Sequence, residues 1–148
     1  MRIWGLAGAL LLALPMSAQA RSVEQVFKNF GLIGVWAGAC NAPADVDSGN
    51  AHAIYAVSST ADVMLTYDYG VKHSPAVYTI VSAKPMGRDR VSYVEERVQD
   101  KARVTVTVMK ARDKLSVVSS VGADGKAFVQ NGKVVATGMP SPQQVRCF

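Results

Sequence analysis

The feature that most constrains this 148-residue chain is a series of short segments, from Gly34 onward, in which apolar and polar residues alternate. The clearest is 102–110, where Val104, Val106 and Val108 share one face. Successive side chains of a strand point to opposite faces, so this alternation is typical of a half-buried β-strand. Strands are predicted at 34–40, 51–57, 61–69, 76–84, 90–98, 102–110, 114–121 and 126–130, with further extended pieces at 133–137 and 144–148.

Short, turn-rich connections separate these segments, and no helical pattern lies between them. One connection contains Asn131-Gly132, a strong signal for a type I′ hairpin. Many short strands at this spacing indicate an antiparallel meander, and a long meander hides its edges by closing on itself. We therefore expect an all-β fold: an antiparallel up-and-down barrel of about eight strands, with one short N-terminal helix.

The helix is predicted at Ser22–Phe30. Its apolar residues follow helical spacing, Ser22 and Gln25 form a capping box, and Gly31 suits the position after the last turn. A helix this short is not stable alone, so its apolar stripe is expected to pack on the barrel.

The first twenty residues have the three parts of a secretory signal peptide. Arg2 supplies the positive charge, Ile3–Leu14 is apolar, and Ala18-Gln19-Ala20 fits a cleavage site. A spanning helix needs roughly 20 apolar residues, so an anchor left in the membrane is the less favoured alternative and no stable anchor is expected. We expect residues 1–20 to be removed and 21–148 to form one exported domain, periplasmic or secreted; the short signal favours a bacterial source.

Cys40 and Cys147 are the only cysteines. In an oxidising compartment such a pair usually forms a disulfide, here closing a loop of over a hundred residues. A redox pair is the weaker alternative, because the spacing is unlike C-x-x-C.

Gly34-Val35-Trp36, after the predicted helix and at the head of the first strand, resembles the G-x-W signature of lipocalin-like (calycin) barrels. The resemblance implies that the helix closes one barrel end, that Trp36 packs over it, and that a late basic residue, here Arg146, lies across it. It also implies a disulfide tying the C-terminal segment to the barrel, as Cys40–Cys147 would. The chain is short and lacks the family's late Thr-Asp-Tyr-like loop, so the expectation is a small calycin-like barrel. The alternative is an ordinary core Trp on a strand.

No sequence pattern indicates catalysis, a metal or a cofactor. The chain has no H-E-x-x-H, G-x-S-x-G or phosphate-binding loop, and His52 and His73 read as strand-edge and loop residues. Glu95 and Glu96 are strand neighbours, so they point to opposite faces and cannot form a carboxylate dyad. We expect no enzyme; a Ser–His–acid set keeps catalysis as a third-ranked alternative.

An eight-stranded barrel is just wide enough to be filled by side chains or to hold one small ligand. The ligand-binding candidates are Trp36, Tyr55, Tyr67, Tyr69, Tyr78 and Tyr93. The leading hypothesis is a non-enzymatic protein that binds a small, partly apolar ligand inside the barrel. The alternative is a protein-binding module, such as a protease or lysozyme inhibitor. A cavity of roughly 300 Å³ or more lined by these tyrosines would favour the first, and a filled interior the second.

The chain carries a formal net charge of +5, and its basic residues gather on two predicted hairpins. Alternate hairpins of a meander share one end, so a basic end is predicted, made of Lys84, Arg88, Arg90, Lys110, Arg112 and Lys114. Such an end could attract an anionic envelope component or a protein; the alternative is that these residues only keep hairpin tips soluble. Nucleic acid is not expected, since no strand face interleaves aromatic and basic residues.

Overall fold

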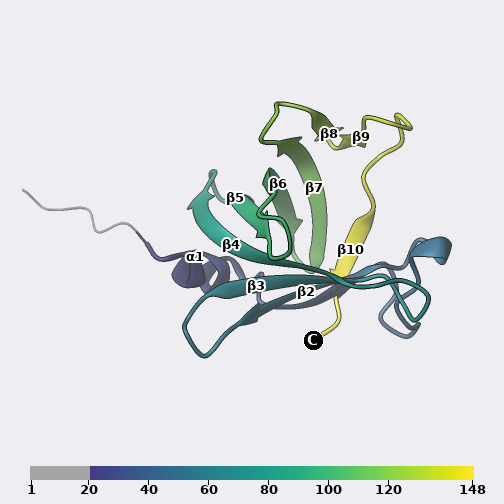
Figure 1. The fold of residues 1–148 in the computed structure, drawn as a ribbon, viewed down its shortest axis with the longest axis horizontal. Coiled ribbons are helices and arrows are strands. Elements are labelled where there is room, and N and C mark those ends of the chain that lie inside the picture. The colour runs from purple at the N-terminus through teal and green to yellow at the C-terminus, as the bar shows by residue number, and fades with distance from the viewer. Residues whose placement is uncertain (1–20) are drawn as a thin grey trace, which may run out of the picture.

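The computed structural model describes residues 21–148, and the predicted signal peptide lies outside the described residues. The elements follow the predicted order closely (Figure 1). They are α1 (Val23–Phe30), β1 (Gly34–Ala37), β2 (His52–Val57), β3 (Val63–Asp68), β4 (Ala76–Pro85), β5 (Arg90–Arg97), β6 (Arg103–Ala111), β7 (Lys114–Gly122), β8 (Ala127–Gln130), β9 (Lys133–Val134) and β10 (Gln143–Arg146), with a 3-10 turn at Val46–Ser48.

Strands β1 to β7 form an antiparallel meander, and β10 pairs with both β1 and β7. These eight strands close into a barrel, which confirms the predicted fold class. The strand pairing that closes the ring involves few residues. Trp36 of β1 lies opposite Arg146 on one side of β10, and Lys114 of β7 lies opposite Val145 on the other. The far half of β7 pairs instead with β8, so the β8–β9 hairpin projects beyond the ring (Figure 1).

Helix α1 begins after Ser22, whose hydroxyl accepts a hydrogen bond from the Gln25 amide at 3.2 Å. It ends at Gly31, whose left-handed backbone (φ 67°) directs its amide to the last carbonyls of the helix. The apolar stripe faces the barrel, where the Phe27 ring lies 5.6 Å from the Tyr55 ring and 5.4 Å from the Tyr93 ring. The helix prediction is confirmed, and α1 packs mainly against β4 and β3.

We call the end that carries α1 the closed end; the hairpins β2–β3, β4–β5 and β6–β7 turn there. The opposite end, with the β1–β2, β3–β4 and β5–β6 loops, is the open end. The core concentrates at the closed end, where Phe27, Leu32, Trp36 and Leu65 are fully buried. Trp36 donates its indole N–H to the Leu32 carbonyl at 2.8 Å, and this bond satisfies the one polar atom of its ring.

The predicted disulfide between Cys40 and Cys147 is present. It joins the chain just after β1 to the residue just after β10, and so ties the strand that closes the barrel to the first strand. Beside it, the buried Asn50 organises the long β1–β2 loop. Its side chain accepts from the Ala39 amide at 2.8 Å and donates to the Pro43 carbonyl at 3.0 Å.

Candidate functional site

The barrel interior is filled at the closed end. The Tyr55 and Tyr93 hydroxyls lie 2.8 Å apart and satisfy each other, and both rings pack on Phe27. Burial raises the pKa of both phenols above the ordinary value, so both stay protonated in the usual pH range. These two candidate ligand-binding tyrosines therefore form part of the core, as does Trp36.

Towards the open end the interior becomes aromatic and polar. The Tyr67 and Tyr69 rings stack with centroids 6.2 Å apart, and the Tyr78 ring meets Tyr67 edge-on at 5.6 Å. The Arg97 guanidinium lies 5.8 Å from the Tyr78 ring centroid, within cation–π distance. The other three candidate tyrosines thus come together in one cluster.

Glu95 lies inside the barrel, two residues after Tyr93 on β5, with 5% of its surface exposed. Its Oε2 atom has no hydrogen-bond partner among the described residues. Burial raises the pKa of this carboxyl to about 7, against the opposing effects of the Tyr67 hydroxyl and the Arg97 charge. A buried carboxyl oxygen without a partner is costly, which marks Glu95 as the most unusual residue of the interior.

Glu96 faces outward, as the sequence predicts for a neighbour of Glu95. It pairs with Arg103 at 2.8 Å and with Lys101 at 3.6 Å. The hydrogen bond from Arg103 is the main cause that lowers the pKa of Glu96. The two adjacent acids therefore have opposite environments, and no carboxylate dyad forms.

Sequence reasoning did not select Glu95 as a site residue, although a signal was available. Val91 and Tyr93 occupy the inward face of β5, and the period of two places Glu95 on that face. An acid at the third inward position of a strand is a reason to expect a buried polar site.

A small cavity lies in the interior between β2, β3, β6, β7 and β10. Its volume is about 120 Å³, and its lining includes Tyr55, Tyr67, Leu115 and Gln144. Of the six predicted ligand-binding residues, only Tyr55 and Tyr67 line it; Trp36, Tyr69, Tyr78 and Tyr93 do not. The cavity is smaller than the roughly 300 Å³ at which ligand pockets usually begin, so the interior is mostly filled.

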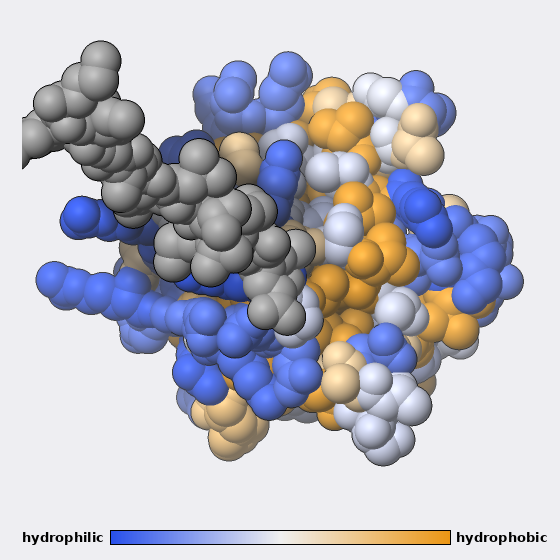
Figure 2. All heavy atoms as spheres, turned by 90° about the vertical axis from the view of Figure 1, so that its left-hand side faces the viewer, coloured by the Kyte–Doolittle hydropathy of each residue, from blue (hydrophilic) through white to orange (hydrophobic). Residues whose placement is uncertain are grey.

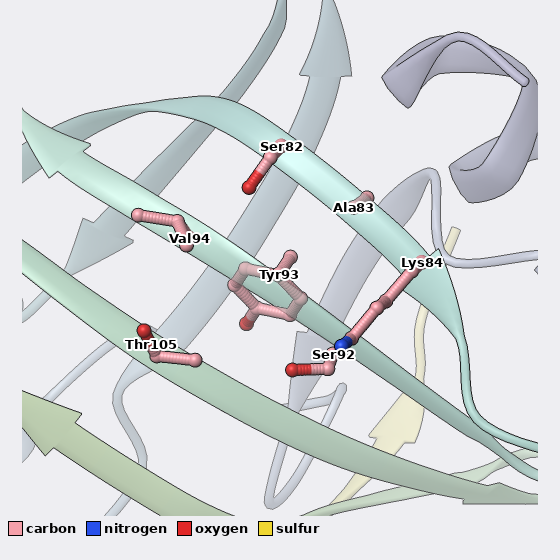
Figure 3. A pocket seen from close by; sticks show the side chains of 7 residues that line it. All are labelled: Ser82, Ala83, Lys84, Ser92, Tyr93, Val94 and Thr105. Carbon is pink, nitrogen blue, oxygen red and sulfur yellow. The ribbon is translucent and has the colours of Figure 1, made fainter. Parts of the chain in front are cut away.

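A second hollow lies on the outer face of the barrel, where the pairing of β4 with β5 shifts register between Ile80 and Ser82. Its volume is about 290 Å³. Figure 3 shows the side chains that line it: Ser82, Ala83, Lys84, Ser92, Tyr93, Val94 and Thr105. Hydroxyls and one lysine could hold a polar molecule there, but within residues 21–148 no buried, unpartnered side-chain atom belongs to this groove.

The six residues predicted to form a basic end lie on the β4–β5 and β6–β7 hairpins, at the closed end. The Lys110 amide donates to the Asp89 carbonyl at 2.8 Å and so fixes one hairpin against the other. Figure 2 looks onto this end, where hydrophilic side chains surround an apolar band.

Among residues 21–148, no group of three or more His, Cys, Asp or Glu is placed to hold a metal ion. His73 lies 3.3 Å from Asp47 on the exposed open-end loops, and His52 lies beside the Asn50 amide. No helix in the described part of the chain is long and apolar enough to cross a membrane.

No family model, no curated protein and no solved structure matches this chain. The positions of Trp36 and Arg146 at the closed end therefore describe this barrel and do not assign it to a family.

Proposed function

We propose that this is an exported, non-enzymatic binding protein that holds a small, partly apolar ligand at the open end of its barrel. The observation that carries the proposal is the buried Glu95 carboxyl, whose Oε2 has no partner among the described residues. A ligand group that donates a hydrogen bond would satisfy this oxygen, and the cluster of Tyr67, Tyr69 and Tyr78 would contact an apolar body.

The cavity of about 120 Å³ adjoins this site through Tyr67, which lines it, whereas Glu95 and Tyr78 do not. Its volume would admit a compact head group and not a whole drug-sized molecule. The remainder would lie on the rim, where Tyr69 is partly exposed and the Tyr69 carbonyl accepts from the Val46 amide of the β1–β2 loop at 3.0 Å. The proposed ligand thus has a donor head, such as an amine or a hydroxyl, on a short apolar body.

Two further features support export. A disulfide persists in oxidising compartments and is rare in the cytosol, and Cys40 and Cys147 are bonded. The first twenty residues also read as a signal peptide. The G-x-W resemblance to lipocalin-like barrels is compatible with binding inside a barrel and adds nothing about the ligand.

Native mass spectrometry of the protein purified from its own host tests the proposal. We expect a bound small molecule on the wild-type protein and on Glu96→Leu, and its loss from Glu95→Leu, which removes the inward carboxyl at similar volume. Glu96→Leu is the matched control because the same change is made one residue along, on the outer face. Wild-type protein that carries nothing, or a ligand retained by Glu95→Leu, would contradict the proposal.

The second candidate is a protein-binding module, such as a protease or lysozyme inhibitor. The filled interior at the closed end and the small cavity favour it. Its test is titration of the protein against secreted proteases and lysozymes. Stoichiometric inhibition by both Glu95→Leu and wild type, without any bound small molecule, would support this second candidate over the first.

A further inference from the structure

The basic end presents its charge on one surface. Five of its six basic residues, Lys84, Arg88, Arg90, Arg112 and Lys114, are exposed, and Lys110 is partly buried. The ion pairs within residues 21–148 involve none of the six; they engage other cations, such as Arg97 and Arg103 at the open end. These positive charges are therefore free to meet charge from outside the molecule.

The two hairpins of this surface are tied together by one hydrogen bond, from the Lys110 backbone amide to the Asp89 carbonyl. A hollow of about 210 Å³ lies between them and the end of α1, lined by Asn29, Phe30, Arg88 and Lys110. Only Asp89 and Asp113 bring negative charge to the same hairpins. The β4–β5 and β6–β7 hairpins therefore form a positively charged platform.

Met86 places an exposed apolar side chain within this platform. Met86, at the tip of the β4–β5 hairpin, is 47% exposed and stands between Lys84 and Arg88 in the chain. An apolar tip flanked by basic residues fits the boundary of an anionic bilayer, where phosphates meet the cations and the acyl region takes the apolar group. A soluble anionic polymer offers the charge but no apolar layer for Met86.

We propose that the basic end docks the protein onto an anionic phospholipid surface, with the β4–β5 tip at the headgroup level. The open end, at the opposite pole of the barrel, then faces the aqueous phase. The docking surface and the Glu95 site share no residue, so this inference stands or fails independently of the proposed function.

Cosedimentation of residues 21–148 with phospholipid vesicles tests the docking. We expect binding to vesicles that contain phosphatidylglycerol, none to phosphatidylcholine alone, and a large loss at high salt because these charges are exposed. Lys84→Glu/Arg88→Glu should lose at least tenfold in binding. Lys72→Glu/Lys126→Glu, which makes the same change of net charge away from the basic end, should bind as the wild type does.

Met86→Ser separates the membrane from a soluble polyanion. We expect weaker binding of this variant to phosphatidylglycerol vesicles and unchanged binding to dextran sulfate. Thermal unfolding of each variant checks that it folds. Equal binding of the two charge-reversal pairs would overturn the proposal, as would wild-type binding to dextran sulfate without binding to phosphatidylglycerol vesicles.

Discussion

Tyr55 and Tyr93 face each other inside the barrel, with their hydroxyls 2.8 Å apart although 38 residues separate them in the chain. Phe27 of α1 packs on both rings, so the helix that closes the barrel rests on this pair. A buried phenol needs a partner for its hydroxyl, and here each tyrosine supplies the partner for the other. Like the bond from Trp36 to the Leu32 carbonyl, this pair places a hydrogen bond among apolar core residues.

Tyr55→Phe is expected to lower the free energy of unfolding by about 1–3 kcal/mol, because the Tyr93 hydroxyl stays buried without its partner. Tyr55→Phe/Tyr93→Phe should cost less than the sum of the single changes, since no orphaned hydroxyl remains. Urea unfolding of the four proteins measures the coupling, with the half-buried Tyr69→Phe as the control. Strictly additive losses would show that the hydroxyls do not depend on each other.

The Cys40–Cys147 disulfide joins residues 107 positions apart in the sequence. In the chain-entropy model a loop of this length contributes about 4–5 kcal/mol of stability, by restricting the unfolded chain. Cys40→Ala/Cys147→Ala should therefore show a much lower urea midpoint, and reduction of the wild type should lower the midpoint similarly. Unchanged midpoints would mean that the pairing of β10 with β1 and β7 holds the closure without the bond.

The strands and the helix could be predicted because their signals are local. The alternation along β6 and the Ser22 cap of α1 each act within a few residues of sequence. The strand that completes the ring has no such signal. β8 follows β7 in the chain but lies outside the ring, whereas β10 pairs with the first half of β7 and completes the ring. Which of the two strands completes the ring depends on contacts between distant parts of the chain.

The candidate site likewise combines features that follow from local sequence with features that depend on distant parts of the chain. The inward direction of Glu95 follows from the period of β5, but its lack of a partner depends on what the opposite wall supplies. The mutual bond of Tyr55 and Tyr93 likewise depends on the register of β2 against β5 around the barrel. Such relations across the interior cannot be predicted from one strand's pattern.

Gly34 has a backbone φ of 137°, and a Cβ at this position would overlap the Phe148 carbonyl oxygen. That oxygen accepts a hydrogen bond from the Val35 amide at 3.0 Å, so Gly34→Ala should displace the C-terminal residues from β1. Gly125→Ala is the control, because Gly125 also has a positive φ (83°) but open space around it. Both should carry backbone strain of about 1–3 kcal/mol, and only Gly34→Ala should speed hydrogen exchange at Val35. Equal exchange in the two variants would exclude the steric explanation.

Glu95 should make the stability of the protein fall as pH rises. Burial raises the pKa of this carboxyl from 4.5 to about 7, so between these values the folded state holds a proton that the unfolded state has released. The free energy of unfolding should therefore decline from about pH 4.5 and level off above pH 7, by about 3 kcal/mol. Glu95→Gln removes this ionisation, and its stability relative to wild type should rise over the same window in urea unfolding at a series of pH values.

Glu96→Gln is the matched control, and its effect should have the opposite sign. The hydrogen bond from Arg103 lowers the pKa of Glu96, so its ion pairs stabilise the fold above the usual carboxyl pKa and are lost as pH falls through the lowered value. Glu96→Gln should thus be less stable than wild type at neutral pH and approach it in acid. A Glu95→Gln variant whose stability follows the wild-type pH profile would show that the Glu95 carboxyl is not buried in the folded protein, and the proposed ligand site would lose its basis.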